Sequence, residues 1–507
     1  MLIHELFFNT AAQTPDAPAI EFSGTVTTYY EAAIRVRVLA QTLADTLPAH
    51  SRVAVHMRKS DKAVLTLLAC LTAGMTYVPI DPRYPPLRLR EVVMAASVTA
   101  LLVDDVSLLS WDEDWLRATG VAVIDVTMTM TDCACKHQSL MMRPEDSAYI
   151  LFTSGSTGVP KGVIITHANA AAFVGWACRA FDVRPDDRVA VHAQLNFDLP
   201  VFDLYVTLAK GGTVVMIDEE TTMYPQALFN FLREHRITVL YAVPSALNSL
   251  VAKSTLCRDG LPDLRLLLYA GEEYLPGPLR RLVEAIPSAR VFNLYGPIET
   301  NVVTYLEVRP EHLDMPRVPL GNPVDNVKLV LVDADGCIVQ RAGQSVISPT
   351  DGEIIVIGEC VSPGYLNKPE ATEASRLIVN GAMGYRTGDY GSWDDDGTLR
   401  FLGRRDSLVK IRGFRVELGD VEAVLVRHPS VVEAVVVACS DLDLMKTLTA
   451  FVHAKDKLSA KAVRVWVSHQ LPDYMRPAQY VILDTFPRTG TGKIDRRALE
   501  VLDGEKS

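Results

Sequence analysis

The stretch LFTSGSTGVPKG occupies residues 151–162 and overlaps the end of a predicted strand, Tyr149–Thr153. Its glycines, its Ser and Thr hydroxyls and Lys161 offer backbone N–H groups, hydroxyl donors and one cation to an anionic ligand. The spacing excludes a Walker A loop, because Gly158 is followed by Val-Pro-Lys-Gly, and it also lacks the GxGxxG and G-x-S-x-G patterns. The stretch therefore predicts a phosphate-binding loop that follows a strand.

Short β-branched runs alternate with helix-length segments on both sides of this loop. Strands spaced in this way predict an α/β body with largely parallel, doubly covered sheets. The predicted strands are Arg52–His56, Ala100–Val103, Val121–Val126, Tyr149–Thr153, Val189–His192, Thr213–Ile217, Thr238–Val243, Leu264–Ala270 and Arg290–Leu294.

The pattern changes in the last third of the chain. After about residue 320, Gly- and Asp-rich segments such as 327–336 and 352–358 predict a smaller β subdomain. From Leu408 onward, a strand and turn, helices near 418–427 and 461–470, and strands 431–439 and 448–453 predict a small α+β domain. We therefore expect an N-terminal core over residues 1–405 and a C-terminal lid domain over residues 406–507.

Composition and charge exclude several classes of protein. The 507 residues are 49% hydrophobic and 22% charged, as in a folded globular chain of more than one domain. A formal charge of −11 argues against nucleic-acid binding. The apolar runs are shorter than the roughly 18 residues of a membrane span, and no signal peptide is apparent, so we expect a cytoplasmic protein without a membrane partner. Eight cysteines without a CxxC pair predict free thiols.

Further motifs follow the phosphate loop in a fixed order. Together with it they resemble the adenylate-forming superfamily, and within it the amino-acid adenylation domains of nonribosomal peptide synthesis. The resemblance extends from about Phe7 to Arg497. The other motifs are AGMTYVPIDP (73–82), NFDLPVFD (196–203), NLYGPIET (293–300), YRTGD (385–389), GRRDSLVKIRGFR (403–415) and TGTGKIDR (489–496).

The resemblance implies an ATP and Mg²⁺ site. Glu299 would hold Mg²⁺, Tyr295 would lie against the adenine, Asp389 would accept both ribose hydroxyls, and Arg404 would contact the nucleotide. The residues implied for this site, of which Thr153, Glu299 and Lys493 are also expected to be catalytic, are Thr153, Ser154, Gly155, Ser156, Thr157, Gly158, Lys161, Gly271, Glu272, Asn293, Tyr295, Glu299, Thr300, Asp389, Arg404 and Lys493.

The resemblance also implies two half-reactions. Lys493, from the small domain, would bridge the substrate carboxylate and the phosphates during adenylation. Asp406 would be the hinge about which this domain swings, so that Lys410 and the turn at Arg412 and Gly413 replace Lys493 for thioester formation.

Some positions depart from the family pattern. Pro200 stands in place of a usual Ser, Ile298 in place of a Thr and Thr491 in place of an Asn. None of these changes removes a charged or chelating group, so we expect activity. Only 14 residues follow Lys493, too few for a carrier domain, and no condensation motif precedes the core. We therefore expect a free-standing enzyme that loads the phosphopantetheine arm of a separate carrier protein.

The family's specificity positions predict the substrate. Asp198 would offer a carboxylate to an α-ammonium group, and the other positions are apolar except for one phenol, which disfavours charged or amide side chains. This set resembles that of the L-prolyl-AMP ligases that load proline on a carrier protein for oxidation to a pyrrole, with Val303 in place of a cysteine, and we expect L-proline. The positions are Asp198, Leu199, Phe202, Tyr241, Leu268, Ala270, Leu294, Val302 and Val303, with Lys493 as the tenth.

Three alternatives stay open at this point. The pocket could accept another small apolar amino acid, such as Val, Ile, Ala or Ser. The chain could be an acyl- or aryl-CoA ligase or a luciferase-like oxygenase, although these lack an acid at the position of Asp198. It could also be a nucleotide-binding regulatory protein without catalysis, against which Glu299, Asp389 and Lys493 argue.

Overall fold

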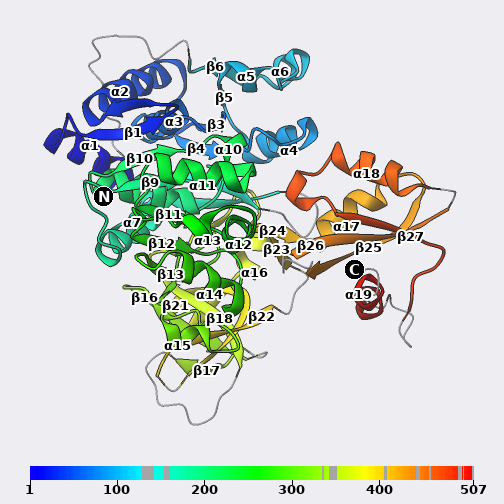
Figure 1. Ribbon diagram of the computed structural model, residues 1–507. Coiled ribbons are helices and arrows are strands. Elements are labelled where there is room, and N and C mark those ends of the chain that lie inside the picture. Colours follow the sequence, from blue (N-terminus) through cyan, green and yellow to red (C-terminus); the bar gives the residue numbers. More distant parts are fainter. Residues whose placement is uncertain are drawn as a thin grey trace. The chain divides into compact units, whose positions relative to one another are not determined.

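The computed structural model describes residues 1–127, 142–153, 160–333, 336–341, 351–394, 396–404, 408–440, 446–455, 458–488, 494 and 496–504. The chain divides into two compact units (Figure 1). The first comprises Met1–Pro82, Ala96–Leu151 and Gly162–Arg405, and the second comprises Arg83–Ala95, Phe152–Lys161 and Asp406–Ser507. No helix of the described residues is long and apolar enough to cross a membrane.

A nine-stranded sheet forms the centre of the first unit. Its inner strands, from β13 to β1, are parallel, and antiparallel strands flank them at both edges. In spatial order the strands are β15 (Asn322–Pro323), β14 (Thr304–Glu307), β13 (Arg290–Tyr295), β12 (Leu266–Tyr269), β11 (Val239–Ala242), β9 (Arg188–Val191), β10 (Thr213–Met216), β1 (Pro18–Phe22) and β2 (Thr25–Thr28).

A second, seven-stranded sheet carries the strand before the phosphate loop. Its core strands are parallel, while the short β19 pairs antiparallel with β8. The spatial order is β19 (Gly364–Tyr365), β8 (Lys161–Thr166), β7 (Ser147–Thr153), β4 (Thr76–Pro79), β3 (Arg52–His56), β5 (Ala100–Val103) and β6 (Ala122–Asp125).

The nine-stranded sheet is buried on both faces. Along β11, Val239 and Tyr241 belong to a core cluster shared with the seven-stranded sheet, whereas Leu240 and Ala242 belong to a different cluster. The shared cluster includes residues of α1 (Ile3–Gln13), α2 (Tyr29–Thr46), α3 (Asp61–Thr72) and α7 (His167–Ala180). The other cluster includes α11 (Pro225–Glu234), α12 (Pro244–Lys253), α13 (Leu256–Asp259) and α14 (Pro276–Ala285).

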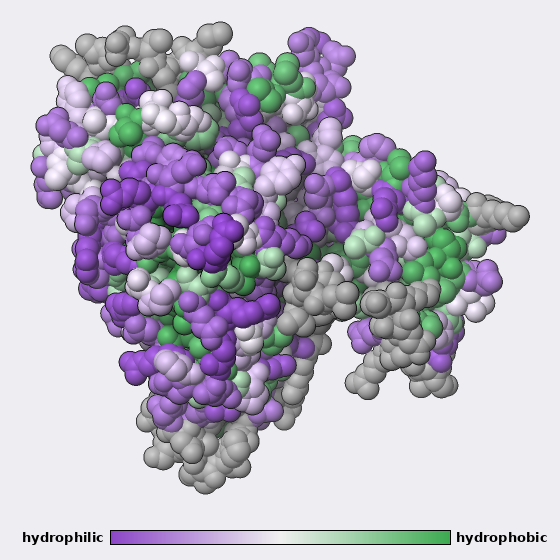
Figure 2. All heavy atoms as spheres, viewed as in Figure 1, coloured by the Kyte–Doolittle hydropathy of each residue, from purple (hydrophilic) through white to green (hydrophobic). Residues whose placement is uncertain are grey.

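The remaining helices before residue 375 are α4 (Pro86–Ala96), which belongs to the second unit, and several short helices of the first unit. The short helices are α5 (Asp105–Leu108), α6 (Glu113–Thr119), α8 (Leu199–Val201), the π-helix η1 (Phe202–Val206), α9 (Thr207–Ala209), α10 (Glu219–Met223), α15 (Pro310–Leu313) and α16 (Pro369–Ala374). On the viewed face of the molecule, hydrophilic side chains predominate and hydrophobic patches are small (Figure 2).

The predicted β subdomain is an antiparallel sheet within the first unit. One face of this sheet is buried through its own side chains Leu329, Leu331, Ile354 and Trp393, which are all nearly inaccessible to solvent. Its strands are β17 (Ile338–Arg341), β16 (Val327–Val332), β18 (Gly352–Gly358), β21 (Ala382–Trp393) and β20 (Arg376–Val379), with β22 (Leu399–Arg404) paired to β21.

The C-terminal part of the second unit is α+β. A hairpin, β23 (Leu408–Ile411) and β24 (Phe414–Glu417), precedes a three-stranded sheet of β25 (Val431–Ser440), β26 (Lys446–Ala454) and β27 (Gln479–Leu483). Its helices are α17 (Leu418–Val426), α18 (Ala460–Ser468), the 3₁₀-helix η2 (Asp473–Met475) and α19 (Arg496–Gly504). Its core combines α17, α18 and the three-stranded sheet.

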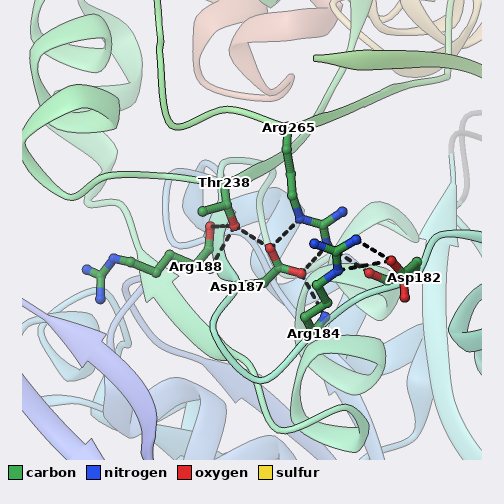
Figure 3. Close-up of polar contacts among 6 residues, drawn as sticks. All are labelled: Asp182, Arg184, Asp187, Arg188, Thr238 and Arg265. Atoms are coloured by element: carbon green, nitrogen blue, oxygen red, sulfur yellow. Dashed lines mark hydrogen bonds and ion pairs between the residues drawn. The ribbon is translucent and has the colours of Figure 1, made fainter. Parts of the chain in front are cut away.

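A buried ion-pair network joins the amino ends of three parallel strands (Figure 3). Asp187, which precedes β9, accepts hydrogen bonds from Thr238 Oγ1, Arg265 Nε and the backbone N–H of Arg184 at 2.7, 2.8 and 2.7 Å. A second guanidinium nitrogen of Arg265 also pairs with Asp187. Thr238 and Arg265 precede β11 and β12, so this single carboxylate ties three strands together.

The predicted mixed α/β fold, with a β subdomain and a small α+β part at the C-terminal end, is confirmed. All nine strands predicted for the α/β body are present, with ends shifted by no more than two residues. Among the strands of the nine- and seven-stranded sheets, the sequence did not predict β1, β2, β4, β8, β14, β15 or β19, and near the C-terminal end it predicted neither β27 nor α19.

Candidate active site

The carboxyl ends of the parallel strands β9, β11, β12 and β13 lie along one edge of the nine-stranded sheet. In the register, Tyr241 of β11 pairs with Leu268 of β12, which pairs with Phe292 of β13. Because side chains alternate between the faces of a strand, Leu294 projects from the same face as these three residues. Ligands of open α/β sheets bind outside the carboxyl ends of the strands. The sheet therefore brings three predicted specificity residues, Tyr241, Leu268 and Leu294, to the edge where ligands bind in such folds.

Seven of the nine expected specificity residues that precede Lys493 belong to one large core cluster. Leu199, Phe202, Tyr241, Leu268, Ala270, Leu294 and Val302 all belong to the core cluster between the two sheets. Val303 is fully buried, but it packs in the β-subdomain cluster with residues such as Leu320 and Trp393. Adjacent residues of an extended segment point to opposite sides, and it is Val302 that packs with the other pocket residues.

Asp198 lies at the start of the helix that carries Leu199 and Phe202. It is the N-cap residue of α8, and Pro200 occupies one of the first helical positions, where a missing N–H costs no hydrogen bond. The backbone at Pro200 is therefore compatible with the helix. α8 continues directly into the π-helix η1, a rare form that is often found at functional sites.

Two buried tyrosines face the negative charge of Asp198. Burial raises the pKa of Tyr241 well above its usual value, and the carboxylates of Asp198 and Asp203 raise it further. Burial and the charges of Tyr205 and Asp198 likewise raise the pKa of Tyr149. Both phenols thus stay protonated, and the negative charge near them is the partly exposed carboxylate of Asp198.

A second group of expected residues meets at the end of β13. Tyr295 donates a hydrogen bond from its hydroxyl to Asp389 Oδ2 at 2.7 Å, and Arg404 pairs with Asp389 Oδ1 at 2.7 Å. Burial raises the pKa of Tyr295, and the charge of Asp389 adds to this effect. Asn293, on the same strand, donates from Nδ2 to the carbonyl of Pro319 at 2.8 Å. Two of the four side chains come from β13, and the other two come from the consecutive strands β21 and β22, about a hundred residues later in the sequence.

Glu299 lies in the loop that follows this strand. It is 2% exposed, and its Oε1 accepts a hydrogen bond from the hydroxyl of Tyr365 at 2.7 Å. A Cβ atom at Gly296 would lie 1.7 Å from the carbonyl oxygen of Asn301, so the loop can fold back only because residue 296 is glycine. Thr300 is fully buried and donates its hydroxyl to backbone carbonyls within the loop.

The Gly271 and Glu272 turn follows β12. Gly271 has a φ of +92°, a conformation that favours glycine, and Glu272 Oε2 accepts a hydrogen bond from the backbone N–H of Ser245 at 2.8 Å.

At the phosphate loop, Thr153 ends β7 and Lys161 begins β8, and the Thr153 hydroxyl lies 3.5 Å from the Lys161 carbonyl oxygen. Ser154, Gly155, Ser156, Thr157 and Gly158 lie outside the described residues.

The residues expected to act in the second half-reaction belong to the second unit. Lys410 lies on β23 and pairs with Arg415 of β24. Arg412 and Gly413 form the two-residue hairpin loop between these strands, with φ values of +51° and +82°. Such loops require positive φ at both positions, which is unusual for an arginine. Asp406 and Lys493 lie outside the described residues.

Two side chains that support the site were not among the residues expected from the sequence. Tyr365 contacts Glu299, and Glu353 accepts hydrogen bonds from Arg386 and Gly388, next to Asp389. The sequence around these two residues gives only a weak indication of their role: Glu353 is an acidic residue inside an otherwise apolar strand, and Tyr365 follows a glycine in a loop. Among the described residues, no group of three or more His, Cys, Asp and Glu side chains could hold a metal ion.

Comparison with known families agrees with this geometry. Residues 7–366 match the AMP-binding enzyme family, and residues 420–493 match the AMP-binding enzyme C-terminal domain. The chain belongs to the AMP-binding enzyme family. This assignment confirms the resemblance drawn from the sequence motifs, and the members of this family that act as ligases use ATP.

Two relatives are similar over nearly their whole length. An L-proline--[L-prolyl-carrier protein] ligase of Pseudomonas fluorescens is 35% identical over 513 residues, which cover 98% of this chain and 98% of the relative. A ligase of the same name from Streptomyces coelicolor is 36% identical, covering 97% of this chain and 94% of the relative.

Solved structures share the fold. The amide bond synthetase McbA of Marinactinospora thermotolerans superposes with a TM-score of 0.87 at 26% identity, covering 99% of both chains. The Vibrio cholerae adenylation domain AlmE, solved in complex with glycyl-adenosine-5'-phosphate, superposes with a TM-score of 0.86 at 25% identity, covering 99% of this chain and 98% of that one.

Proposed function

We propose that this AMP-binding enzyme activates L-proline with ATP and transfers it to the phosphopantetheine thiol of a separate carrier protein. The first step forms prolyl-AMP and releases pyrophosphate, and the second forms a thioester and releases AMP. The observation that carries this proposal is the near full-length similarity to two relatives named L-proline--[L-prolyl-carrier protein] ligase.

The pocket chemistry supports an amino acid with an apolar side chain. Asp198 offers a carboxylate to the ammonium group of proline, and this pairing favours amino acids over plain carboxylic acids. The apolar walls that include Phe202, Leu268, Leu294 and Val302 offer no partner to a polar side chain, which would lose its hydration without compensation. Proline satisfies both conditions.

In this proposal the second group of residues binds the nucleotide. Tyr295 lies against adenine, Asn293 with the Gly271 and Glu272 turn bounds its edge, and Asp389 accepts the ribose hydroxyls. Tyr295 and Arg404 each donate one hydrogen bond to Asp389, and a carboxylate has about four lone-pair sites, so it can also accept from a ribose. The phosphate oxygens face the loop from Thr153 to Gly158 and Lys161.

A Mg²⁺ ion fits this site by its donor chemistry. Glu299 supplies a buried carboxylate oxygen, the kind of ligand that Mg²⁺ prefers, and Tyr365 orients that carboxylate. Because the described residues provide no cluster of acidic ligands nearby, the phosphate oxygens of ATP and water would complete the coordination. When bound, the ion supplies positive charge to the phosphate oxygens.

The reaction needs a cation close to the two anions that react. We assign this role to Lys493, whose ammonium group would hold the carboxylate of proline against the α-phosphate and stabilise the charge of the transition state. In the second step the lid domain, residues 406–507, would turn about Asp406, and the hairpin with Lys410, Arg412 and Gly413 would replace Lys493 beside the site.

ATP–pyrophosphate exchange tests the proposal. The assay compares L-proline with L-valine, L-isoleucine, D-alanine, L-serine and simple carboxylic acids, and we expect the highest rate with L-proline. A faster exchange with any other substrate would refute the assignment.

Lys493→Ala should abolish most of the exchange while ATP binding, measured by calorimetry, stays largely intact, because the lysine acts on the reacting carboxylate. Exchange within a few-fold of the parent would refute its role.

A further inference from the structure

Asp389 projects from an irregular part of strand β21. In the register with β18, Arg386 pairs with Ile355 and Tyr390 pairs with Glu353, so Thr387, Gly388 and Asp389 lie opposite the single residue Ile354. Extra residues of this kind form a β-bulge, which bends a strand and changes the direction of a side chain. The position of the Asp389 carboxylate therefore depends on what holds the bulge in shape.

Glu353 holds the bulge from the neighbouring strand. Its Oε1 accepts a hydrogen bond from the backbone N–H of Gly388 at 3.1 Å. Its Oε2 accepts two hydrogen bonds from Arg386, one from Nε at 3.1 Å and one from Nη2 at 2.5 Å. Glu353 is 5% exposed and Arg386 is partly exposed, so the carboxylate side of these contacts is shielded from water, and hydrogen bonds between charged groups are stronger than neutral ones.

The bulge has a second, neutral support on its other side. The hydroxyl of Thr387 donates to the carbonyl of Ile354 at 2.8 Å and accepts the backbone N–H of Asp389 at 3.0 Å. Gly388 has a φ of +73°, which most residues avoid. Each residue of the bulge thus has a fixed partner, and Glu353 is the charged one among them.

We propose that Glu353 is a positioning residue for nucleotide binding: by holding Arg386 and Gly388 it aims the Asp389 carboxylate at the ribose hydroxyls. The inference rests on the proposed function, since it requires Asp389 to bind the ribose of ATP. It adds a residue that does not itself touch the nucleotide. A purely structural ion pair would lower stability without changing which nucleotide is preferred.

The test compares ATP with 2′-deoxy-ATP in L-proline-dependent pyrophosphate exchange. Glu353→Gln keeps the shape of the side chain but turns an amide N–H₂ or a weaker acceptor toward Arg386. We expect the preference for ATP, as a ratio of kcat/KM values, to fall about tenfold, as for the loss of one hydrogen bond to a charged group. The KM for L-proline should stay within twofold.

Glu21→Gln is the matched control. Glu21 is 9% exposed and pairs with Arg188 at 2.7 Å on a different sheet, so its loss also breaks a buried Glu–Arg pair. This variant should lose thermal stability yet keep the ATP preference of the parent. Arg386→Lys is a milder second variant in case Glu353→Gln does not fold, and it should lower the preference in the same direction.

Asp389→Asn distinguishes a failure of the positioning role of Glu353 from a failure of the ribose assignment of Asp389. A fall of the ATP preference in Asp389→Asn but not in Glu353→Gln and Arg386→Lys would overturn the positioning role and leave the nucleotide assignment standing. An unchanged preference in Asp389→Asn itself would overturn the ribose assignment and the inference with it. An equal fall in Glu21→Gln would also overturn the inference.

Discussion

Replacement of Asp187 by alanine should strongly destabilise the N-terminal unit. The side chain is 2% exposed and faces the guanidinium of Arg265, the hydroxyl of Thr238 and the backbone N–H of Arg184 (Figure 3). Alanine would leave the Arg265 charge, which is itself only 28% exposed, without its counter-ion. Removal of one partner of a buried ion pair costs about 3–5 kcal/mol, and we expect a loss of that size in the free energy of unfolding.

Urea unfolding followed by circular dichroism measures this loss through the shift of the midpoint at constant slope. Asp182→Ala is the control, because Asp182 pairs with Arg184 nearby but is 65% exposed, and exposed pairs contribute little. The network joins the amino ends of the strands, whereas the site lies at their carboxyl ends, so the KM for L-proline should not change in either variant. A loss below about 1 kcal/mol in Asp187→Ala, or an equal loss in the control, would refute the reasoning.

Three further outcomes follow from the structure. Asp198→Asn should lower kcat/KM for L-proline about 100-fold in pyrophosphate exchange with an unchanged KM for ATP, because the ammonium group loses its counter-ion; a tenfold or smaller effect would contradict the role of this carboxylate. Arg412→Asn, which retains a residue suited to positive φ, should spare exchange but slow carrier loading; equal losses in both assays would contradict the division of the half-reactions. Burial lowers the pKa of His56 to about 4, below its ordinary 6.5, so the unfolded chain binds the proton more tightly. His56 should therefore lower the free energy of unfolding by about 1.4 kcal/mol per pH unit as pH decreases from 6.5 to 4, and the slope of His56→Gln should be smaller by this amount.

Local sequence predicted the strands of the α/β body well. Runs such as Arg52–His56 and Ala100–Val103 coincide with β3 and β5, because a parallel strand buried on both faces needs a continuous run of apolar, mostly β-branched residues. The short strands β14 and β15, on one side of the nine-stranded sheet, were not predicted. They carry no such run, and only strand pairing makes them strands: β14 pairs with β13, and β15 pairs with β14.

The order of the motifs likewise predicted the family, while the roles that it implies for the site residues stay predictions. It could not show which of two neighbours, Val302 or Val303, packs with the pocket, since this depends on the direction of one extended segment. Nor could it show that the backbone accommodates Pro200, which follows from the place of this residue in the first turn of a helix.

The sequence by itself determined the family, most strands of the α/β body and the chemical types of side chain available to a ligand, because periodicity and motif spacing are local properties. Only the tertiary structure decided which groups meet. Tyr365 reaches Glu299 across 66 residues of chain, and Glu353 meets Gly388 across 35. Such contacts arise from strand pairing and from a bulge in its register, and neither leaves a pattern in the residues on either side.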